Sequence, residues 1–462
     1  MASRARIVAI ALTSLLLPRS AGAEPGLHWQ PPIVLAEGGG ERGTWRQNDS
    51  RYDYVDDATV AFLPGGELGL AWVDQKRKEV FFQKAGWRDF RPVGTPQNVS
   101  RNPATFSWQP RIAVAKDAGQ VPGAIYSLWQ EIIFSGGSHG GDILFARSTD
   151  GGAGFSAPLN LSRSRGGDGK GRQSRSVWSN GSHDLAVAVN GDVLAAWTEY
   201  DGALWFARSR DGGARFTAPR KIAGNEARPA RAPALATGPG GTAVLAWSVG
   251  EERAAAIRVV QSGDGGARFG PVQLVGGGQG QADAPRLAVD GKGAVHLVYA
   301  ETPERPGACS VIRYAHSPRG AGRFGTPRTI SGSAAGSAAY PAIGTDRSGR
   351  VYVTWEATAP GVSRPGALGI AWSADGGQRF AAPAEVPGSA APAGSSNGSH
   401  QGLLGKKLAV DHSGRIAVVN SSLGAATGSR VWLVRGQCNC GAAAGPARSS
   451  RSSASRSAGL TR

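Results

Sequence analysis

The chain has 462 residues, of which 69 are glycine and 28 are proline, and 40% of the residues are hydrophobic. No long segment has helical periodicity, so this composition favours many short strands joined by tight turns. The formal net charge is +17, but three arginines before residue 24 and four after residue 440 carry seven of these charges. The remaining cations form no basic helix and no basic-aromatic stripe, which excludes nucleic acid as an expected partner and leaves a basic surface attracted to anionic polymers.

The first residues have the pattern of a secretory leader. Arg4 and Arg6 precede an apolar run from Ile7 to Leu17, and the small residues 21–23 follow it. This pattern predicts a signal peptide over residues 1–23, cleaved after Ala23, because the apolar run is too short to span a bilayer. No later apolar run is long enough to span a membrane, so we expect an exported protein, periplasmic or extracellular.

A short motif then returns along the chain. The copies are ARSTDGGAGFSAP from Ala146, ARSRDGGARFTAP from Ala207, VQSGDGGARFGPV from Val260, AWSADGGQRFAAP from Ala371 and a degraded AHSPRGAGRFGTP from Ala315. Their phenylalanines, at positions 155, 216, 269, 324 and 380, are 61, 53, 55 and 56 residues apart. Each interval holds four short strands joined as hairpins, which predicts the blades of a β-propeller.

The motif itself has a structural explanation. Asp150, Asp211, Asp264 and Asp375 can accept backbone N–H groups across a tight turn, and the glycines supply backbone angles that other residues resist. The phenylalanine is expected to fold back over the hairpin and bury itself between blades, worth about 2 kcal/mol. The pattern S-x-D-G-G-x-x-F resembles the Asp-box, or bacterial neuraminidase repeat, of the sialidase superfamily. The resemblance covers nearly all of the chain after the leader and implies an all-β propeller.

The number of blades follows from the first strand of each unit. These strands begin near residues 57, 110, 183, 233, 285, 341 and 406, which predicts seven blades, with six as the alternative. The last unit lacks a fourth strand, and residues 28–38 match that strand, with Trp29 in the Phe place and Pro32 in the Pro place. We therefore expect the N-terminal strand to close the ring in a single propeller domain over residues 24–440. The sialidase resemblance implies a six-bladed ring, so the prediction of seven blades departs from that family.

Candidate site residues gather on the face opposite the repeated hairpins. His139, His183 and His400 each follow a serine in loops of that face, where they either bond loop carbonyls or, as the weaker alternative, coordinate a metal. Acidic residues recur at the ends of the second strands, where they either are solvated loop residues or form a ring that binds cations or a sugar hydroxyl. These residues are Asp74, Glu131, Glu199, Glu301 and Glu356.

Cations and one tyrosine begin the first strands: Arg111, Arg231, Arg286, Lys407 and Tyr340. Arg111, Arg286, Lys407 and Asp184 share one offset, so they are expected to ring the channel mouth, either pairing internally or receiving an anionic sugar. The sialidase resemblance implies three arginines on a carboxylate, a tyrosine nucleophile with a glutamate partner, and an aspartate acid/base. Carried to this sequence, the catalytic set is Tyr340, Glu199, Glu356 and Asp57. The family's aromatic-Arg-Ile-Pro motif is absent, and the looser Arg231-Ala232-Pro233 lies in mid-chain.

The sequence thus predicts an exported, monomeric propeller that binds or hydrolyses an anionic glycan, without cofactor or metal. The alternative is a non-enzymatic propeller that holds another exported protein. Of the three cysteines, Cys438 and Cys440 are too close in sequence for an unstrained disulfide bond. A disulfide bond between Cys309 and either Cys438 or Cys440 is possible in an oxidising compartment. Residues 441–462 are Ser, Ala, Gly and Arg without an apolar pattern, which predicts a disordered tail.

Overall fold

The computed structural model describes residues 26–44, 46, 49–116, 121–135, 138–163, 171–172, 178–179, 183–199, 201–250, 255–277, 280–332, 336–398, 405–424 and 426–438, with backbone only at 42, 132–140, 171–172 and 178–179. The predicted leader and tail lie outside the described residues. No helix in the described part is long and apolar enough to cross a membrane.

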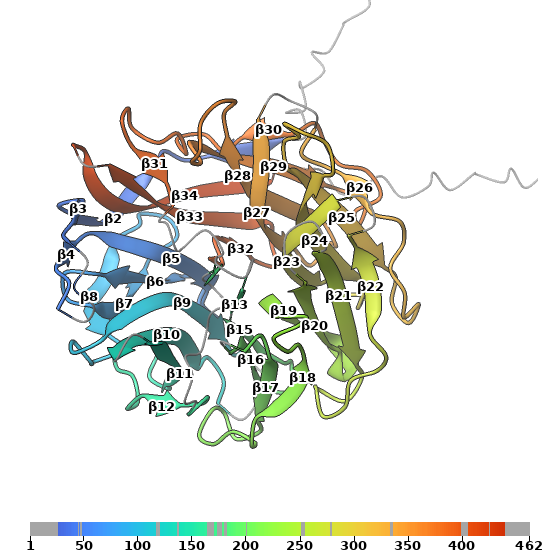
Figure 1. The fold of residues 1–462 in the computed structure, drawn as a ribbon, viewed down its shortest axis with the longest axis horizontal. Coiled ribbons are helices and arrows are strands. Elements are labelled where there is room, and N and C mark those ends of the chain that lie inside the picture. Colours follow the sequence, from blue (N-terminus) through green and yellow to red (C-terminus); the bar gives the residue numbers. More distant parts are fainter. Residues whose placement is uncertain are drawn as a thin grey trace, which may run out of the picture.

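Seven antiparallel sheets stand side by side around a central axis (Figure 1), which confirms the predicted seven-bladed propeller. Blade 1 consists of β5 (Val55–Phe62), β6 (Leu68–Asp74), β7 (Glu79–Ala85) and β8 (Pro92–Asn98). Blade 2 consists of β9 (Phe106–Val114), β10 (Ile125–Ser135), β11 (Ser138–Ser148) and β12 (Leu159–Asn160). Blade 3 consists of β15 (His183–Val187), β16 (Val193–Thr198), β17 (Leu204–Ser209) and β18 (Arg220–Ala223). Blade 4 consists of β19 (Ala230–Thr237), β20 (Ala243–Val249), β21 (Ala256–Ser262) and β22 (Gln273–Gly276). Blade 5 consists of β23 (Gly280–Val289), β24 (Val295–Pro303), β25 (Val311–Ser317) and β26 (Arg328–Thr329). Blade 6 consists of β27 (Ser337–Thr345), β28 (Val351–Thr358), β29 (Ala367–Ser373) and β30 (Ala384–Glu385).

Blade 7 joins the two ends of the chain. Its strands are β31 (Ser396–Asn397), β32 (Leu408–Val410), β33 (Arg415–Gly424), β34 (Gly428–Cys438), β1 (Leu27–Trp29) and β2 (Ile33–Gly38). Both β1 and β2 pair antiparallel with β34, and the indole of Trp29 covers Gly436. The N-terminal strand therefore supplies the missing fourth strand, as predicted, and leaves no open edge at the closure.

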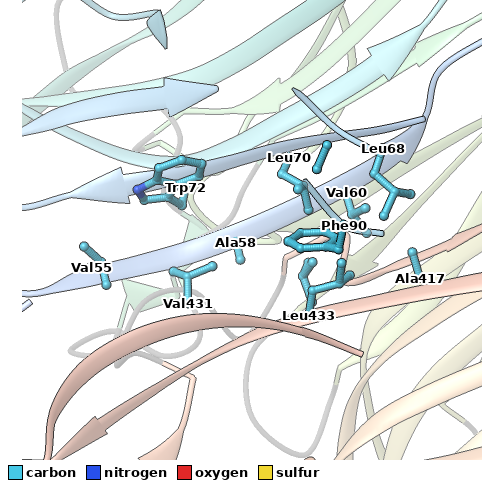
Figure 2. Close-up of a cluster of buried hydrophobic side chains, with 12 residues drawn as sticks. Val55, Ala58, Val60, Leu68, Leu70, Trp72, Phe90, Ala417, Val431 and Leu433 are labelled. Atoms are coloured by element: carbon cyan, nitrogen blue, oxygen red, sulfur yellow. The ribbon is translucent and has the colours of Figure 1, made fainter. Parts of the chain in front are cut away.

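The core lies between blades, because the second strand of each sheet is buried on both faces over most of its described length. In β16 all six residues are buried, and in β20 all seven. At the closure, side chains of blade 1 such as Trp72 and Leu70 meet Val431 and Leu433 of blade 7 (Figure 2). A propeller of this kind has one apolar layer per blade interface instead of a single central core.

The repeated hairpins have the expected turn. Ser148 Oγ donates to Asp150 Oδ1 at 2.7 Å, and the same aspartate oxygen accepts the N–H of Gly154 at 3.1 Å. The following phenylalanine, Phe155, packs edge-on against Phe82 of blade 1, with ring centroids 5.3 Å apart. It is half-buried instead of fully buried, because the hairpin lies at the rim of the blade.

The blades give the propeller two different faces. The turns between first and second strands and the hairpins between third and fourth strands form the hairpin face. The loops between second and third strands, and those that enter each first strand, form the loop face. Two short ribbons, β3 (Glu41–Arg42) with β4 (Tyr52–Asp53) and β13 (Gly171–Arg172) with β14 (Trp178–Ser179), belong to loops that enter first strands.

The cysteines limit the possible disulfides. Cys438 is disulfide-bonded, whereas Cys309 is a free, exposed thiol. Cys309 is therefore not the partner of Cys438. The long-range pairing that the sequence left open is excluded for Cys438, and the fold does not use a disulfide between blades 5 and 7.

Candidate functional site

Strained backbone marks the loop-face end of the central channel. Five first strands, β5, β9, β19, β23 and β27, contain a bulge with a non-glycine residue at positive φ. These residues are Asp57, Gln109, Ala232, Ala284 and Tyr340, with φ between 48° and 55°. In four of the five a proline follows, and a residue before proline normally adopts an extended conformation. Such strain persists only where the surrounding fold imposes it, and bulges commonly redirect side chains beside binding sites.

Three of the bulges meet at one point. Tyr340 packs against Ala232 and Ala284, which are both buried at the equivalent positions of blades 4 and 5. These two neighbours have only a methyl side chain, and Tyr340 is partly exposed. Tyr340 is therefore the one large side chain among these three bulge residues.

Two carboxylates lie close enough to act on Tyr340. Burial, with Asp283 and Glu356, raises the pKa of the Tyr340 hydroxyl to about 12. Glu356 comes from the neighbouring strand, where it pairs in register with Ala339. The phenol is neutral at physiological pH and so can donate a hydrogen bond to a ligand.

Glu356 is fully buried and is held mainly by blade 7. Its Oε1 contacts Lys407 Nζ and accepts a hydrogen bond from Asn420 Nδ2 at 3.0 Å. Its other oxygen, Oε2, has no hydrogen-bond partner among the described residues. Tyr340 donates no hydrogen bond to Glu356 in the described part of the chain. Lys407 therefore pairs internally, and Glu356 is partly neutralised.

A second charged cluster crosses the channel. Lys406 of blade 7 reaches blade 3, where Nζ lies 2.7 Å from Asp184 Oδ1 and 2.5 Å from the carbonyl oxygen of Leu185. Burial and Arg286 lower the pKa of Arg111 to about 10. Although burial opposes it, Lys406 and Arg286 hold the pKa of Asp184 below its ordinary value. Arg111, Arg286 and Asp184 are thus brought together, with Lys406 in the place that the sequence assigned to Lys407.

Arg231 occupies a separate, paired position. Its side chain is completely buried, and Nη2 lies 3.2 Å from Asp283 Oδ2 of the next blade. Asp283 also accepts a hydrogen bond from Ser248 Oγ at 2.7 Å. This ion pair connects blades 4 and 5.

Two predicted site residues link neighbouring blades. Asp57 Oδ2 accepts the N–H of Gln109 at 2.9 Å, and His183 Nε2 lies 2.8 Å from the carbonyl oxygen of the same residue. Burial and Arg111 lower the pKa of His183 to about 3, so the ring is neutral. Both side chains are buried and bond backbone groups, as expected for residues that hold first strands together.

The predicted histidine cluster has one described member. The side chain of His139 and all of His400 lie outside the described residues. Among the residues that the structure describes, no group of three His, Cys, Asp or Glu side chains is arranged to hold a metal ion.

The other second-strand acids have separate local roles. Glu131 accepts hydrogen bonds from Asn102 and Thr105, Glu301 pairs with Arg313 at 3.0 Å, and Asp74 binds the N–H groups that follow it. Burial, then Asp201, raises the pKa of the half-buried Glu199. No hydrogen bond or ion pair of the described residues joins Glu199 to Tyr340. Glu131, Glu301 and Glu356 are buried, so they are not solvated loop ends.

Sequence reasoning missed Lys406, Asp283 and the bulges. The available sign was the recurring X-Pro dipeptide at first-strand starts, as in Gln109-Pro110 and Tyr340-Pro341. A proline inside a strand indicates a bulge or an edge, and these strands lie at the centre of the ring.

No protein-family model matches the sequence, and no curated protein sequence matches it. Among solved structures, the polysaccharide lyase Uly1 is 10% identical with a TM-score of 0.54, and the match covers 89% of this chain and 99% of the lyase. A protein of unknown function from Dyadobacter fermentans DSM 18053 is 17% identical over 75% of this chain and 98% of its own, with a TM-score of 0.47. The Hadza microbial sialidase Hz136 is 14% identical, with a TM-score of 0.43, and the match covers 66% of this chain and 63% of the sialidase. At these identities the likeness to the lyase concerns the fold alone.

Proposed function

We propose that this chain is an exported propeller that binds a carboxylate-bearing glycan at the loop-face mouth of its channel. The observation that carries the proposal is the partly exposed Tyr340, held at positive φ against two alanines where three bulged first strands meet. An amphipathic ring that carries a hydroxyl suits a sugar, whose faces are apolar and whose edges carry hydroxyls. The leader-like residues 1–23 support export, and the Ser-Asp-Gly-Gly hairpins support descent from the sialidase superfamily.

The charge of the cluster favours an acidic ligand. Arg111, Arg286 and Lys406 converge on Asp184, and burial lowers the pKa of all three cations. The guanidinium groups are buried, so we propose that they attract a ligand carboxylate mainly through the field of the channel, not by direct contact.

Binding is better supported than hydrolysis. A tyrosine nucleophile needs a base within hydrogen-bond reach, whereas Glu356 is held by Lys407 and Asn420 and accepts no hydrogen bond from Tyr340 among the described residues. Asp57 is occupied by a backbone N–H of blade 2. Hydrolysis is the second candidate, because Glu356 still lies beside Tyr340 in the sheet.

Calorimetry with sialyllactose, a glucuronic acid disaccharide and lactose tests the binding site. We expect the acidic sugars to bind more tightly than lactose, and Tyr340→Phe to weaken them roughly tenfold by removing one hydrogen bond. Tyr352→Phe is the matched control, because Tyr352 lies in the same blade but bonds Asp346 near the hairpin face. Equal affinity for acidic and neutral sugars would refute the proposal.

A panel of fluorogenic glycosides, sialosides included, separates the two candidates. No turnover is expected from a binding protein. Turnover that Tyr340→Phe abolishes would replace the binding proposal by an exo-glycosidase.

A further inference from the structure

The degraded hairpin of blade 5 differs from its four sister hairpins in charge. In the sisters an aspartate binds the turn, and in three of them it also pairs with an arginine four residues later. Arg215, Arg268 and Arg379 lie 3.1, 3.1 and 3.2 Å from Asp211, Asp264 and Asp375. Blade 5 keeps the arginine of this pair as Arg323, but Arg319 stands in place of the aspartate. Two cations therefore replace an ion pair.

Neither cation has a neutralising partner in the part of the chain that the structure describes. Arg319 and Arg323 are both exposed, and within the described residues neither side chain forms an ion pair or hydrogen bond. The hydrocarbon part of Arg319 lies against the turn at Gly293, 3.3 Å from the position of an added Cβ atom. The guanidinium of Arg319 is thus held beside the neighbouring turn of its own blade.

Two further exposed cations lie on adjoining turns of the hairpin face. Lys292 belongs to the turn that Arg319 contacts, and Arg347 belongs to the equivalent turn of blade 6. The two turns are neighbours, because a Cβ at Gly349 would lie 3.7 Å from Asp290 Oδ2. We name the four residues Lys292, Arg319, Arg323 and Arg347 the blade 5 patch.

The acids of these turns are kept away from the surface. Asp290 and Asp346 are each 4% exposed. Asp290 accepts the N–H groups of Lys292 and Ala294, both at 2.9 Å. Asp346 accepts hydrogen bonds from Ser348 Oγ at 2.6 Å and Tyr352 Oη at 3.1 Å. The turns therefore present cations outward and bury their carboxylates, which leaves the blade 5 patch to a partner of opposite charge.

We propose that the blade 5 patch is a second binding surface, for a polyanionic polysaccharide with carboxylate groups, on the face opposite the Tyr340 site. Arginine binds carboxylates through two parallel N–H donors, which suits a chain that carries one carboxylate on each sugar. The ring of Phe324, which follows Arg323, packs against the apolar layer between blades 4 and 5, whereas single-stranded nucleic acid is bound by stacking on exposed aromatic rings. The exposed residues Val272 and Leu274 flank Gln273, which bonds the carbonyl oxygen of Gly322 beside the patch, but they lie at the edge strand of blade 4 and not on an amphipathic helix of the kind that inserts into a membrane surface.

The two adjacent blades extend the surface. The arginine that precedes the hairpin phenylalanine recurs as Arg268 in blade 4 and Arg379 in blade 6, each about nine-tenths exposed. Because each of these is paired with an aspartate, it adds donors but little net charge. The patch on blade 5 therefore supplies the charge, and the flanking arginines lie along the path of a polymer that follows the rim.

The test is a reversal of charge that the fold already accommodates. Arg319→Asp restores the residue that the four sister hairpins carry, so the variant is expected to fold. Arg210→Asp is the matched control, because it makes the same charge change at an exposed position of the blade 3 hairpin. Affinity for polygalacturonate is measured at several salt concentrations, with neutral dextran and duplex DNA as comparison ligands.

We expect Arg319→Asp to weaken polygalacturonate binding about tenfold or more and to reduce its salt dependence, because two or three ionic contacts are lost. Arg210→Asp and Tyr340→Phe should leave this affinity within about twofold. An equal loss in Arg319→Asp and Arg210→Asp would overturn the proposal in favour of diffuse net charge. Equal affinity for DNA, or no binding of polygalacturonate at physiological salt, would overturn it as well. Loss of sialyllactose binding alone bears on the Tyr340 site and not on the blade 5 patch.

Discussion

A single buried carboxyl sets a pH dependence at the joint between blades 7 and 1. Asp56 is 2% exposed and accepts a hydrogen bond from Ser421 of blade 7. Burial and Asp57 raise the pKa of Asp56 to about 8, from an ordinary value of 3.8. In the folded protein this side chain is therefore a neutral acid at pH 7, which limits the cost of burying it.

The sign of the resulting effect on stability follows from proton binding. Between about pH 4 and pH 8 the unfolded chain has lost the Asp56 proton while the folded chain retains it, so the free energy of unfolding falls as pH rises, by at most about 1.4 kcal/mol per pH unit. Below about pH 4 both states are protonated and the contribution is constant. Asp56→Asn keeps a hydrogen-bond acceptor for Ser421 but cannot ionise. Urea unfolding from pH 4 to pH 9 should thus show the variant gaining stability relative to the wild type as pH rises; parallel curves would contradict the raised pKa.

At the scale of the element, the two glycines of a hairpin have different reasons to be glycine. Gly151 and Gly152 both have positive φ, at 72° and 91°. A Cβ at Gly151 meets nothing within 4 Å, whereas one at Gly152 overlaps the ring of Phe82 and lies 3.3 Å from Ile125 Cδ1. The first glycine serves the turn, and the second also lets the hairpin pack onto the preceding blade.

The pair gives a matched experiment on one turn. Gly151→Ala is expected to lower the free energy of unfolding by about 1 kcal/mol, from the left-handed backbone alone. Gly152→Ala adds steric overlap in a packed interface and should cost about 3 kcal/mol in total. Urea denaturation measures both. Equal losses would mean that backbone conformation, and not packing onto blade 1, decides the second position.

At the scale of the molecule, stability depends on closing the ring with β2. Ile33 packs against the apolar layer between blades 7 and 1, whereas its neighbour Val34 is 43% exposed. Ile33→Asp places a carboxylate at this layer and should destabilise the protein by about 2 to 3 kcal/mol, with Val34→Asp within about 0.5 kcal/mol of the wild type.

Removing the closing strand is the stronger form of this test. Deletion of residues 24–40 leaves β34 as an unpaired edge, so aggregation on size-exclusion chromatography and a lower melting temperature are expected. A monomer with an unchanged melting temperature would show that β1 and β2 are dispensable.

The periodic and local features of this protein can be predicted from its sequence alone. Strand alternation, the spacing of the hairpin phenylalanines and the Trp29–Pro32 match are enough to predict seven blades and their closure, because each depends on neighbouring residues or on a repeat. The acceptor role of Asp150 within its turn is local in the same way. Arg319 in place of an aspartate was also visible in the sequence, although its lack of a partner was not.

Which charged groups meet at the axis depends on how the blades are placed around the ring. Lys406 and Asp184 are 222 residues apart in sequence, and they pair because blades 7 and 3 face each other across the channel. A shared offset in the sequence favoured Lys407 for that place, but Lys407 turns to Glu356 of blade 6 instead. The bulges at Gln109 and Tyr340 likewise depend on the close convergence of seven first strands, since backbone strain of this kind is sustained by the surrounding fold and leaves only a proline as its trace in the sequence.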